Sequence, residues 1–183
     1  TKDGSLIVYE LTGQGDLAGS KAAGISIDEI VHYFTLRNEF LCNKYLNYGV
    51  NRNPQKETHQ LMAILDCDGI SMDKISFVDI ISFIVKSGAI IDDYYPMLVQ
   101  KLFVINTSWA FQYAWGIASA ALPASIKNKI YFPSLEGLDE FIDPSQVRCL
   151  IHFLINILYY VLLKSMGGHV LVILINDSIY YCI

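Results

Sequence analysis

The chain has 183 residues, of which 53% are hydrophobic and 17% are charged, and its net charge is −5. This length favours one domain with a substantial core over two domains. The acidic balance excludes the basic footprint of a nucleic-acid-binding protein. The low share of charged residues predicts a large core or cavity, a partner, or a membrane.

Cysteine and histidine spacing gives no sign of a metal or redox site. The cysteines contain no Cys-x-x-Cys pair and the histidines no His-x-x-x-His pair, which argues against a zinc site, a disulfide scaffold and a resident metal. We expect no catalytic residue and no cofactor, because Cys67 has no identifiable histidine partner and no Gly-x-Ser-x-Gly is present. We expect a reducing, cytoplasmic setting and no secretory leader. The residues concerned are Cys42, Cys67, Cys149 and Cys182, with His32, His59, His152 and His169.

The first sixty residues predict a strand, a glycine loop and a helix. Leu6 to Tyr9 reads as a buried strand, and the glycines from Gly13 to Gly19 indicate a loop. This loop does not match a nucleotide-binding pattern, because its order is Gly-Ser-Lys where a phosphate loop needs Gly-Lys-Ser/Thr. Ser26 and Glu29 have the spacing of a capping box before a helix.

The next segments alternate strand and helix, which predicts an α/β sheet with helical cover. Leu61–Leu65 and Leu102–Ile105 are apolar strands, and a long helical pattern lies between them, with Val78 on its inner stripe and Gly88 as a break. Ser108 caps a further helix through Ala121. A short strand at 130–132 and a short helix at 135–142 follow.

Asp66 and Asp68 end a strand, where carboxylates serve as metal ligands or as an acid/base pair. The structural alternative is that they stabilise the turn and the start of the next helix. We favour the structural alternative.

The order of these features resembles the CRAL-TRIO lipid-binding domain, over residues 2–146. The resemblance rests on Asp66-x-Asp68-Gly69 after a strand, a long helix, Tyr94-Tyr95-Pro96, the strand 102–106 and Lys129-Ile130. Trp109 and Phe111 also resemble the motile-sperm-domain-containing branch of the family.

The resemblance implies an α/β/α sandwich in which a mixed, mainly parallel sheet floors an apolar pocket. A lid helix within Phe111–Ile126 would dock on membranes through its aromatic residues. The alternative for these aromatic side chains is ordinary core packing. As lipid-binding residues we predict Ile64, Tyr94, Phe103, Ile105, Trp109, Phe111 and Trp115, with Ile64, Phe103 and Ile105 in the floor.

Three positions depart from the phosphatidylinositol carriers of the family. Met97-Leu98 replaces the Glu-Arg that follows Tyr-Tyr-Pro, and Glu136 stands where a headgroup lysine is expected. A buried phosphate needs a charge-assisted partner. The predicted ligand is therefore a neutral or unidentified lipid.

Composition changes abruptly after Gln146, since residues 147–183 hold only three formal charges. We divide the chain into a lipid-binding domain at 1–146, incomplete at its N-terminus, and an atypical hydrophobic tail at 147–183. The apolar run 149–163 is short for a membrane span; a buried helix is one alternative. Another alternative is that the apolar insert is a translated intron. Removing the insert would join the family-like ending at 162–169 directly to Gln146.

The predicted function is the binding of a hydrophobic small molecule or lipid, extended to transfer between membranes. The expected partners are that ligand and a transient membrane surface, with no nucleic acid; the location is cytoplasmic and peripherally membrane-associated. Two other classes stay open: a non-catalytic scaffold with a filled core, and a protein anchored by its hydrophobic tail.

Overall fold

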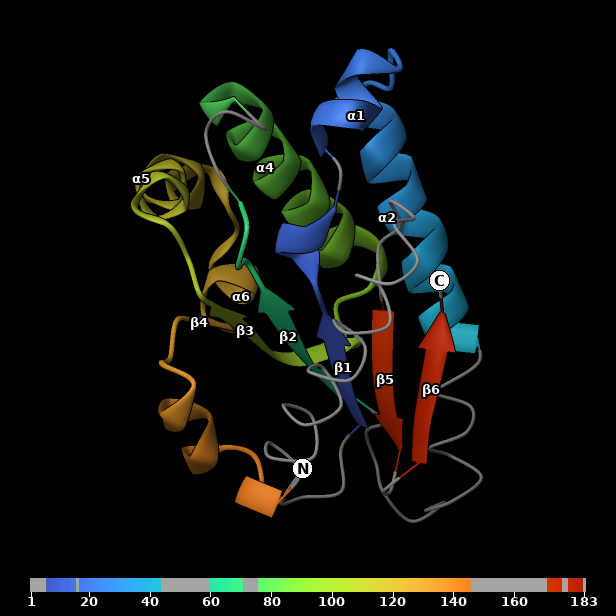
Figure 1. Cartoon of the computed structure of the whole chain (residues 1–183), viewed down its shortest axis with the longest axis vertical. Coiled ribbons are helices and arrows are strands. Elements are labelled where there is room, and N and C mark those ends of the chain that lie inside the picture. The colour runs from blue at the N-terminus through green and yellow to red at the C-terminus, as the bar shows by residue number, and fades with distance from the viewer. Residues whose placement is uncertain are drawn as a thin grey trace.

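A six-stranded sheet organises the computed structural model, which describes residues 6–15, 17–43, 60–70, 76–145, 171–175 and 178–182. The strand order is β4-β3-β2-β1-β5-β6 (Figure 1). β1 to β4 are mutually parallel, β5 pairs antiparallel with β1, and β6 pairs antiparallel with β5. The strands are β1 (Leu6–Glu10), β2 (Leu61–Asp66), β3 (Val99–Ile105), β4 (Ile130–Tyr131), β5 (Leu171–Ile175) and β6 (Ser178–Cys182).

Helices connect the parallel strands, which confirms the predicted α/β class with a mixed, mainly parallel sheet. The α-helices are α1 (Leu17–Ala22), α2 (Ile27–Leu41), α4 (Phe77–Tyr94), α5 (Trp109–Ala118) and α6 (Ala124–Lys127). The described residues also contain the short 3-10 helices η1 (Thr12–Gln14), η3 (Ser119–Ala121) and η4 (Glu136–Glu140).

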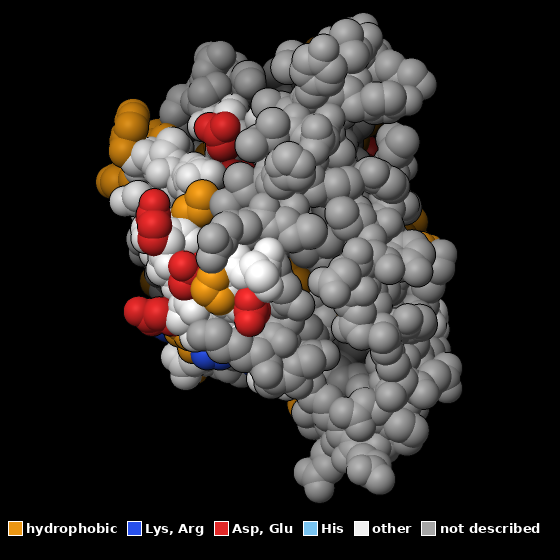
Figure 2. Space-filling view, turned by 60° about the horizontal axis from the view of Figure 1, so that its bottom comes forward, with side chains coloured by type: hydrophobic (Ala, Val, Ile, Leu, Met, Phe, Trp, Pro, Cys, Tyr) orange, Lys and Arg blue, Asp and Glu red, His pale blue; other side chains and the backbone are white. Residues whose placement is uncertain are grey.

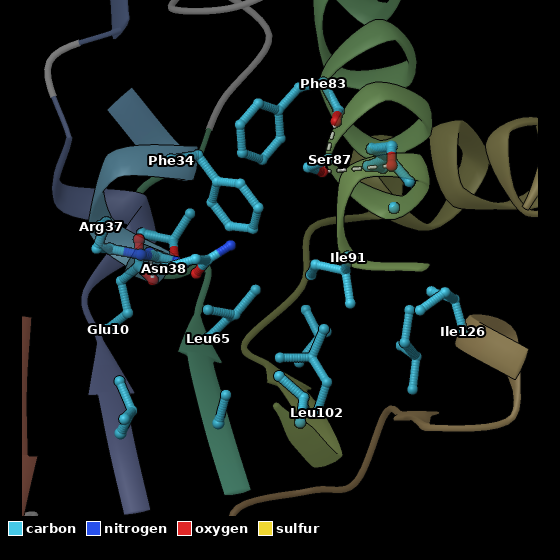
Figure 3. Close-up of a pocket in the computed structure, with 18 of the residues that line it drawn as sticks. Glu10, Phe34, Arg37, Asn38, Leu65, Phe83, Ser87, Ile91, Leu102 and Ile126 are labelled. Atoms are coloured by element: carbon cyan, nitrogen blue, oxygen red, sulfur yellow. Dashed lines mark hydrogen bonds and ion pairs between the residues drawn. The ribbon is translucent and has the colours of Figure 1, made fainter. Parts of the chain in front are cut away.

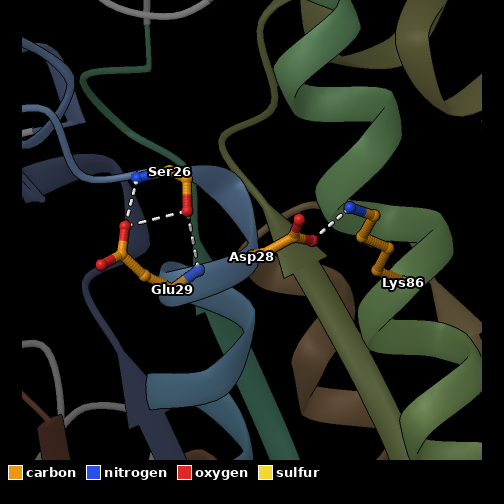
Figure 4. Close-up of polar contacts among 4 residues, drawn as sticks. All are labelled: Ser26, Asp28, Glu29 and Lys86. Atoms are coloured by element: carbon orange, nitrogen blue, oxygen red, sulfur yellow. Dashed lines mark hydrogen bonds and ion pairs between the residues drawn. The ribbon is translucent and has the colours of Figure 1, made fainter.

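Serine side chains start the three long helices. The predicted capping box of α2 is confirmed: the Glu29 amide donates to Ser26 Oγ (3.2 Å), and the Ser26 amide donates to Glu29 Oε2 (2.8 Å) (Figure 4). Ser76 and Ser108 cap α4 and α5 by accepting from Asp79 and Phe111 amides. Such caps satisfy amides that the first helical turn leaves without partners.

Several local predictions were wrong. The glycine loop contains η1 and α1, and Gly19 lies inside α1. Gly88 does not break α4, which continues to Tyr94, and Val78 is 73% exposed on its outer side. Helical period alone left the inner face of this largely apolar helix ambiguous.

The two faces of the sheet pack into separate cores. On one face, residues of β1, β2 and β3 pack against η4 and its flanks; this core includes Ile7, Ile64, Phe103, Leu138 and Ile142. On the other face, a second core includes Val8, Leu41, Leu61, Ala63 and Leu98. Helices α2, α4 and α5 lie over this second face (Figure 1).

The sheet includes residues beyond the predicted domain boundary at residue 146, because β5 pairs with β1 from Ile7 to Glu10. The tail segments 149–163 and 162–169 lie outside the described residues. The interpretation of the tail as translated intron stays a prediction.

Two turns approach each other so closely that only glycine fits. A Cβ on Gly13 of η1 would lie 1.9 Å from the carbonyl oxygen of Asp68. Gly69, in the same turn as Asp68, has a φ of +96°, where a side chain is strained. This contact fixes η1 against the end of β2.

We therefore expect Gly13→Ala to lower the free energy of unfolding by roughly 1–3 kcal/mol or more, because backbone atoms have to move. Gly116→Ala on α5 is the matched control: a Cβ added there would meet no atom within 4 Å, and alanine favours helix by about 1 kcal/mol. Chemical denaturation measures both. Equal stability of the two variants would contradict the prediction.

Candidate functional site

A cavity of about 220 Å³ lies between the second face of the sheet and the helices above it (Figure 3). More than about 10–15 Å³ is needed to hold one water, so this space accommodates a larger molecule. Its lining is mostly aliphatic and aromatic, as is typical of pockets for apolar ligands.

The floor comes from alternate residues of three parallel strands: Val8 of β1, Ala63 and Leu65 of β2, and Leu102 and Val104 of β3. Successive side chains of a strand point to opposite faces. Once the face of the sheet that carries the cavity is known, every second residue of each strand therefore belongs to the floor.

The three residues predicted for the floor do not line this cavity. Ile64, Phe103 and Ile105 point to the opposite face, where each is at most 1% exposed in the core beside η4. The three strands are apolar on both faces, as is usual for buried parallel strands. No local signal in the sequence therefore distinguishes the face that carries the cavity.

Helices α2 and α4 form the walls. Phe34 of α2 and Phe83 of α4 meet edge to face with their ring centroids 5.9 Å apart, which joins the two helices above the cavity. Ile80, Ile84 and Ile91 of α4 also line it. Their spacing of four and seven residues identifies the true inner stripe of this helix.

The segment predicted as a lid provides the remaining wall. Phe111 and Trp115 of α5 line the cavity, as do Leu122 and Ile126. A Cβ on Gly88 would lie 2.3 Å from Leu122 Cδ2, so Leu122 packs directly against this glycine of α4.

Two other predicted ligand-binding residues do not reach the cavity. Trp109 is 74% exposed and lies on the outer side of α5, and Tyr94 is also 74% exposed. Tyr95 instead turns inward, where it donates a hydrogen bond to Glu39 Oε1 (2.6 Å). The Tyr-Tyr pair ends α4, and the sequence did not distinguish its inward member.

A small polar group interrupts the apolar lining where β1 and η1 meet α2. Arg37 forms an ion pair with Glu10, and its guanidinium carbon lies 4.6 Å from the centroid of the Phe34 ring. Thr12 and Asn38 lie beside them in the lining. Sequence reasoning missed this group, although Arg37 and Asn38 interrupt the apolar stripe of Ile30, Phe34 and Leu41.

Asp66 has a structural role, as expected for the turn after β2. It accepts from Tyr9 Oη (2.6 Å), from the Asn106 side chain (2.9 Å) and from the Asp68 amide (3.0 Å). Burial, followed by the hydrogen bond to Asp66, raises the pKa of Tyr9. No cluster of three metal-ligating side chains exists among the described residues.

The CRAL/TRIO domain family model matches residues 2–149. The chain belongs to the CRAL/TRIO domain family. Domains of this family bind lipids or other hydrophobic ligands and are in general not catalytic. No curated protein matched the chain.

One solved CRAL/TRIO structure resembling the chain is the crystal structure of Sfh5, with 16% sequence identity and a TM-score of 0.46. The match covers 69% of this chain and 41% of that one, so this CRAL/TRIO chain spans under half of the solved protein. Neither comparison supports the motile-sperm-domain branch. None of the described helices is long and apolar enough to cross a membrane.

Cys67 provides a test of how well the cavity floor excludes water. It lines the cavity and is 2% exposed; burial, then the nearby carboxylates Asp66 and Glu10, raises the pKa of its thiol from 9.0 to about 12. We expect Cys67 to resist iodoacetamide at pH 8 in the native protein and to react after unfolding, because the thiolate is the nucleophile. Peptide mass spectrometry measures this, with the half-buried Cys42 as internal reference.

The same shift has a pH dependence with a definite sign. The neutral thiol stabilises the fold fully below pH 9, and this contribution is lost as the pH rises from 9.0 towards about 12. Cys67→Ala should reduce that alkaline loss. Alkylation of native Cys67 as fast as Cys42 would show that the floor is open to water.

Proposed function

We propose that this CRAL/TRIO domain binds a hydrophobic small molecule or lipid in the cavity between its sheet and helices. The observation that carries the proposal is the apolar cavity itself, lined by residues of four strands and of α2, α4, α5 and α6 in a domain of a lipid-binding family. Burial of each ligand methylene there contributes about 0.8 kcal/mol. A scaffold with a filled core is less well supported, since 220 Å³ is left unfilled.

We also propose a neutral ligand. Leu98 is 3% exposed and lines the cavity, so the position that departs from the family pattern contributes an apolar surface. Glu136 lies on η4, on the other side of the sheet. Neither residue offers a cation for a phosphorylated headgroup.

Transfer between membranes is the finer part of the proposal. Phe111–Ile126 would act as the lid, moving away from α4 to admit the ligand. Trp109, Tyr113 and Ile117 form an exposed apolar strip along α5, with exposures of 74%, 62% and 50%. Their i, i+4, i+8 spacing places them on one side of the helix, where amphipathic rings favour a membrane interface.

Charge favours a neutral bilayer over an anionic one. The net charge of the chain is −5, and acidic side chains outnumber basic ones on the described surface in Figure 2. A cytoplasmic, peripherally membrane-associated protein fits this proposal. The tail-anchored alternative rests on residues 149–163, outside the described residues.

Filling the cavity tests ligand binding. Ala63→Phe should weaken the affinity for lipid, measured by displacement of an apolar fluorophore, at least about tenfold. The reason is that the phenylalanine ring occupies space above the floor. Ile64→Val is the matched control on the adjacent residue: it should lower stability by about 0.5–1.5 kcal/mol and leave binding intact. Circular dichroism checks both folds. Unchanged binding by a folded Ala63→Phe variant would contradict the proposal.

Membrane docking has a separate test. The double variant Trp109→Ser, Tyr113→Ser should lower partition into phosphatidylcholine vesicles by about tenfold or more, since each buried large apolar side chain contributes about 1.5–3 kcal/mol. Leu36→Ser, which removes a 56% exposed side chain of α2, is the control. Vesicle sedimentation measures partition. An equal loss in both variants would remove α5 as the docking surface.

A further inference from the structure

The four polar residues of the cavity lining at its α2 end form a group that we name the polar corner: Glu10, Thr12, Arg37 and Asn38. They come from β1, η1 and α2, and Figure 3 shows Glu10, Arg37 and Asn38 together at one side of the cavity. The opposite side is formed by apolar residues such as Leu122 and Ile126. The cavity is therefore chemically polarised along its length.

Three buried atoms of the polar corner have no hydrogen-bond partner in the described part of the chain: Thr12 Oγ1, Arg37 Nε and Asn38 Nδ2. Asn38 is only 3% exposed, and Figure 3 shows its amide nitrogen directed away from α2 towards the cavity. Buried hydrogen-bond donors nearly always have a partner in folded proteins, so a cluster of donors without partners needs an explanation.

Two other polar residues of the lining, Ser87 and Lys129, differ in this respect. The Ser87 hydroxyl donates to the carbonyl oxygen of Phe83 (2.6 Å), and Lys129 Nζ donates to the carbonyl oxygen of Pro96 (2.7 Å). Unused hydrogen-bonding capacity is thus concentrated at the α2 end of the cavity. Two of its three atoms are obligate donors, and the Thr12 hydroxyl also donates.

The charge of the polar corner is already balanced. Arg37 pairs with Glu10, and their side chains are 15% and 17% exposed. An anionic ligand group would therefore bring an unbalanced charge into a buried site, which is costly. An uncharged oxygen would accept the free hydrogen bonds at no such cost.

We propose that the polar corner binds the uncharged carbonyl or hydroxyl oxygen of a neutral lipid. The hydrocarbon chain of that lipid lies over the strand floor and ends beside Leu122 and Ile126. This inference rests on the proposed function and adds the ligand's polar group and its orientation.

Three probes of equal chain length separate the inference from the proposed function: dodecane, 2-dodecanone and dodecanoate. Each competes with an apolar fluorophore for the cavity of the 183-residue chain. The expected result is that 2-dodecanone binds about tenfold more tightly than dodecane, the effect of one hydrogen bond to an otherwise unsatisfied buried donor. Dodecanoate should bind more weakly than 2-dodecanone.

Asn38→Leu, which keeps the side-chain size, should remove the advantage of 2-dodecanone over dodecane, because the donor to the ketone oxygen is lost. Its melting temperature should stay the same or rise, because an unsatisfied buried donor is lost. A structural asparagine would instead give a lower melting temperature and weaker binding of every probe. Asn43→Leu, on the exposed asparagine that follows the same helix, is the control and should change no affinity.

Thr12→Val keeps the test decisive if Asn38→Leu does not fold, since it removes a second unsatisfied group and should lower 2-dodecanone affinity several-fold. Equal binding of dodecane and 2-dodecanone by the unaltered chain would overturn the inference and leave the proposed function standing. Tighter binding of dodecanoate would overturn the neutral class. Failure of dodecane and 2-dodecanone to bind would overturn the proposed function together with the inference.

Discussion

The parallel pairing of four consecutive strands is the constraint on which the rest of the domain depends. The order β4-β3-β2-β1 runs in one direction through the sheet. Connections between neighbouring parallel strands are almost always right-handed. When every step goes the same way, this handedness puts every connecting helix on the same face, as observed for α2, α4, α5 and α6. A cavity then forms where the side chains of this single helical layer do not fill the space above the sheet.

The helical layer is held mainly by apolar contacts. Two ion pairs between its helices, Lys21 with Asp79 and Lys86 with Asp28, each have at least one exposed member (Figure 4 shows the second), and such pairs contribute little. Phe34 against Phe83 and Phe77 against Tyr113 are ring contacts between helices. A hydrophobic ligand beneath them would add packing where the layer has least. Its binding would therefore stabilise the folded domain through mass action.

The fold could be predicted further than the site. Apolar runs identified strands, and Ser26 and Ser108 identified the starts of α2 and α5, because both signals are local. The cavity face could not be predicted, since Ala63 and Ile64 are both buried. Glu10 and Arg37 are 27 residues apart, so their pairing left no local pattern. The available signal was Arg37-Asn38 within an otherwise apolar stripe, which sequence reasoning did not use.

The alternation along β2 has a consequence for how such a domain can evolve. Leu61, Ala63 and Leu65 face the cavity, whereas Met62 and Ile64 belong to the core beside η4. A ligand in this cavity would contact the odd-numbered positions of β2 but not the even-numbered ones, so consecutive codons would meet different constraints. A lineage could exchange its ligand by drift at the odd-numbered positions while the even-numbered ones preserve the scaffold.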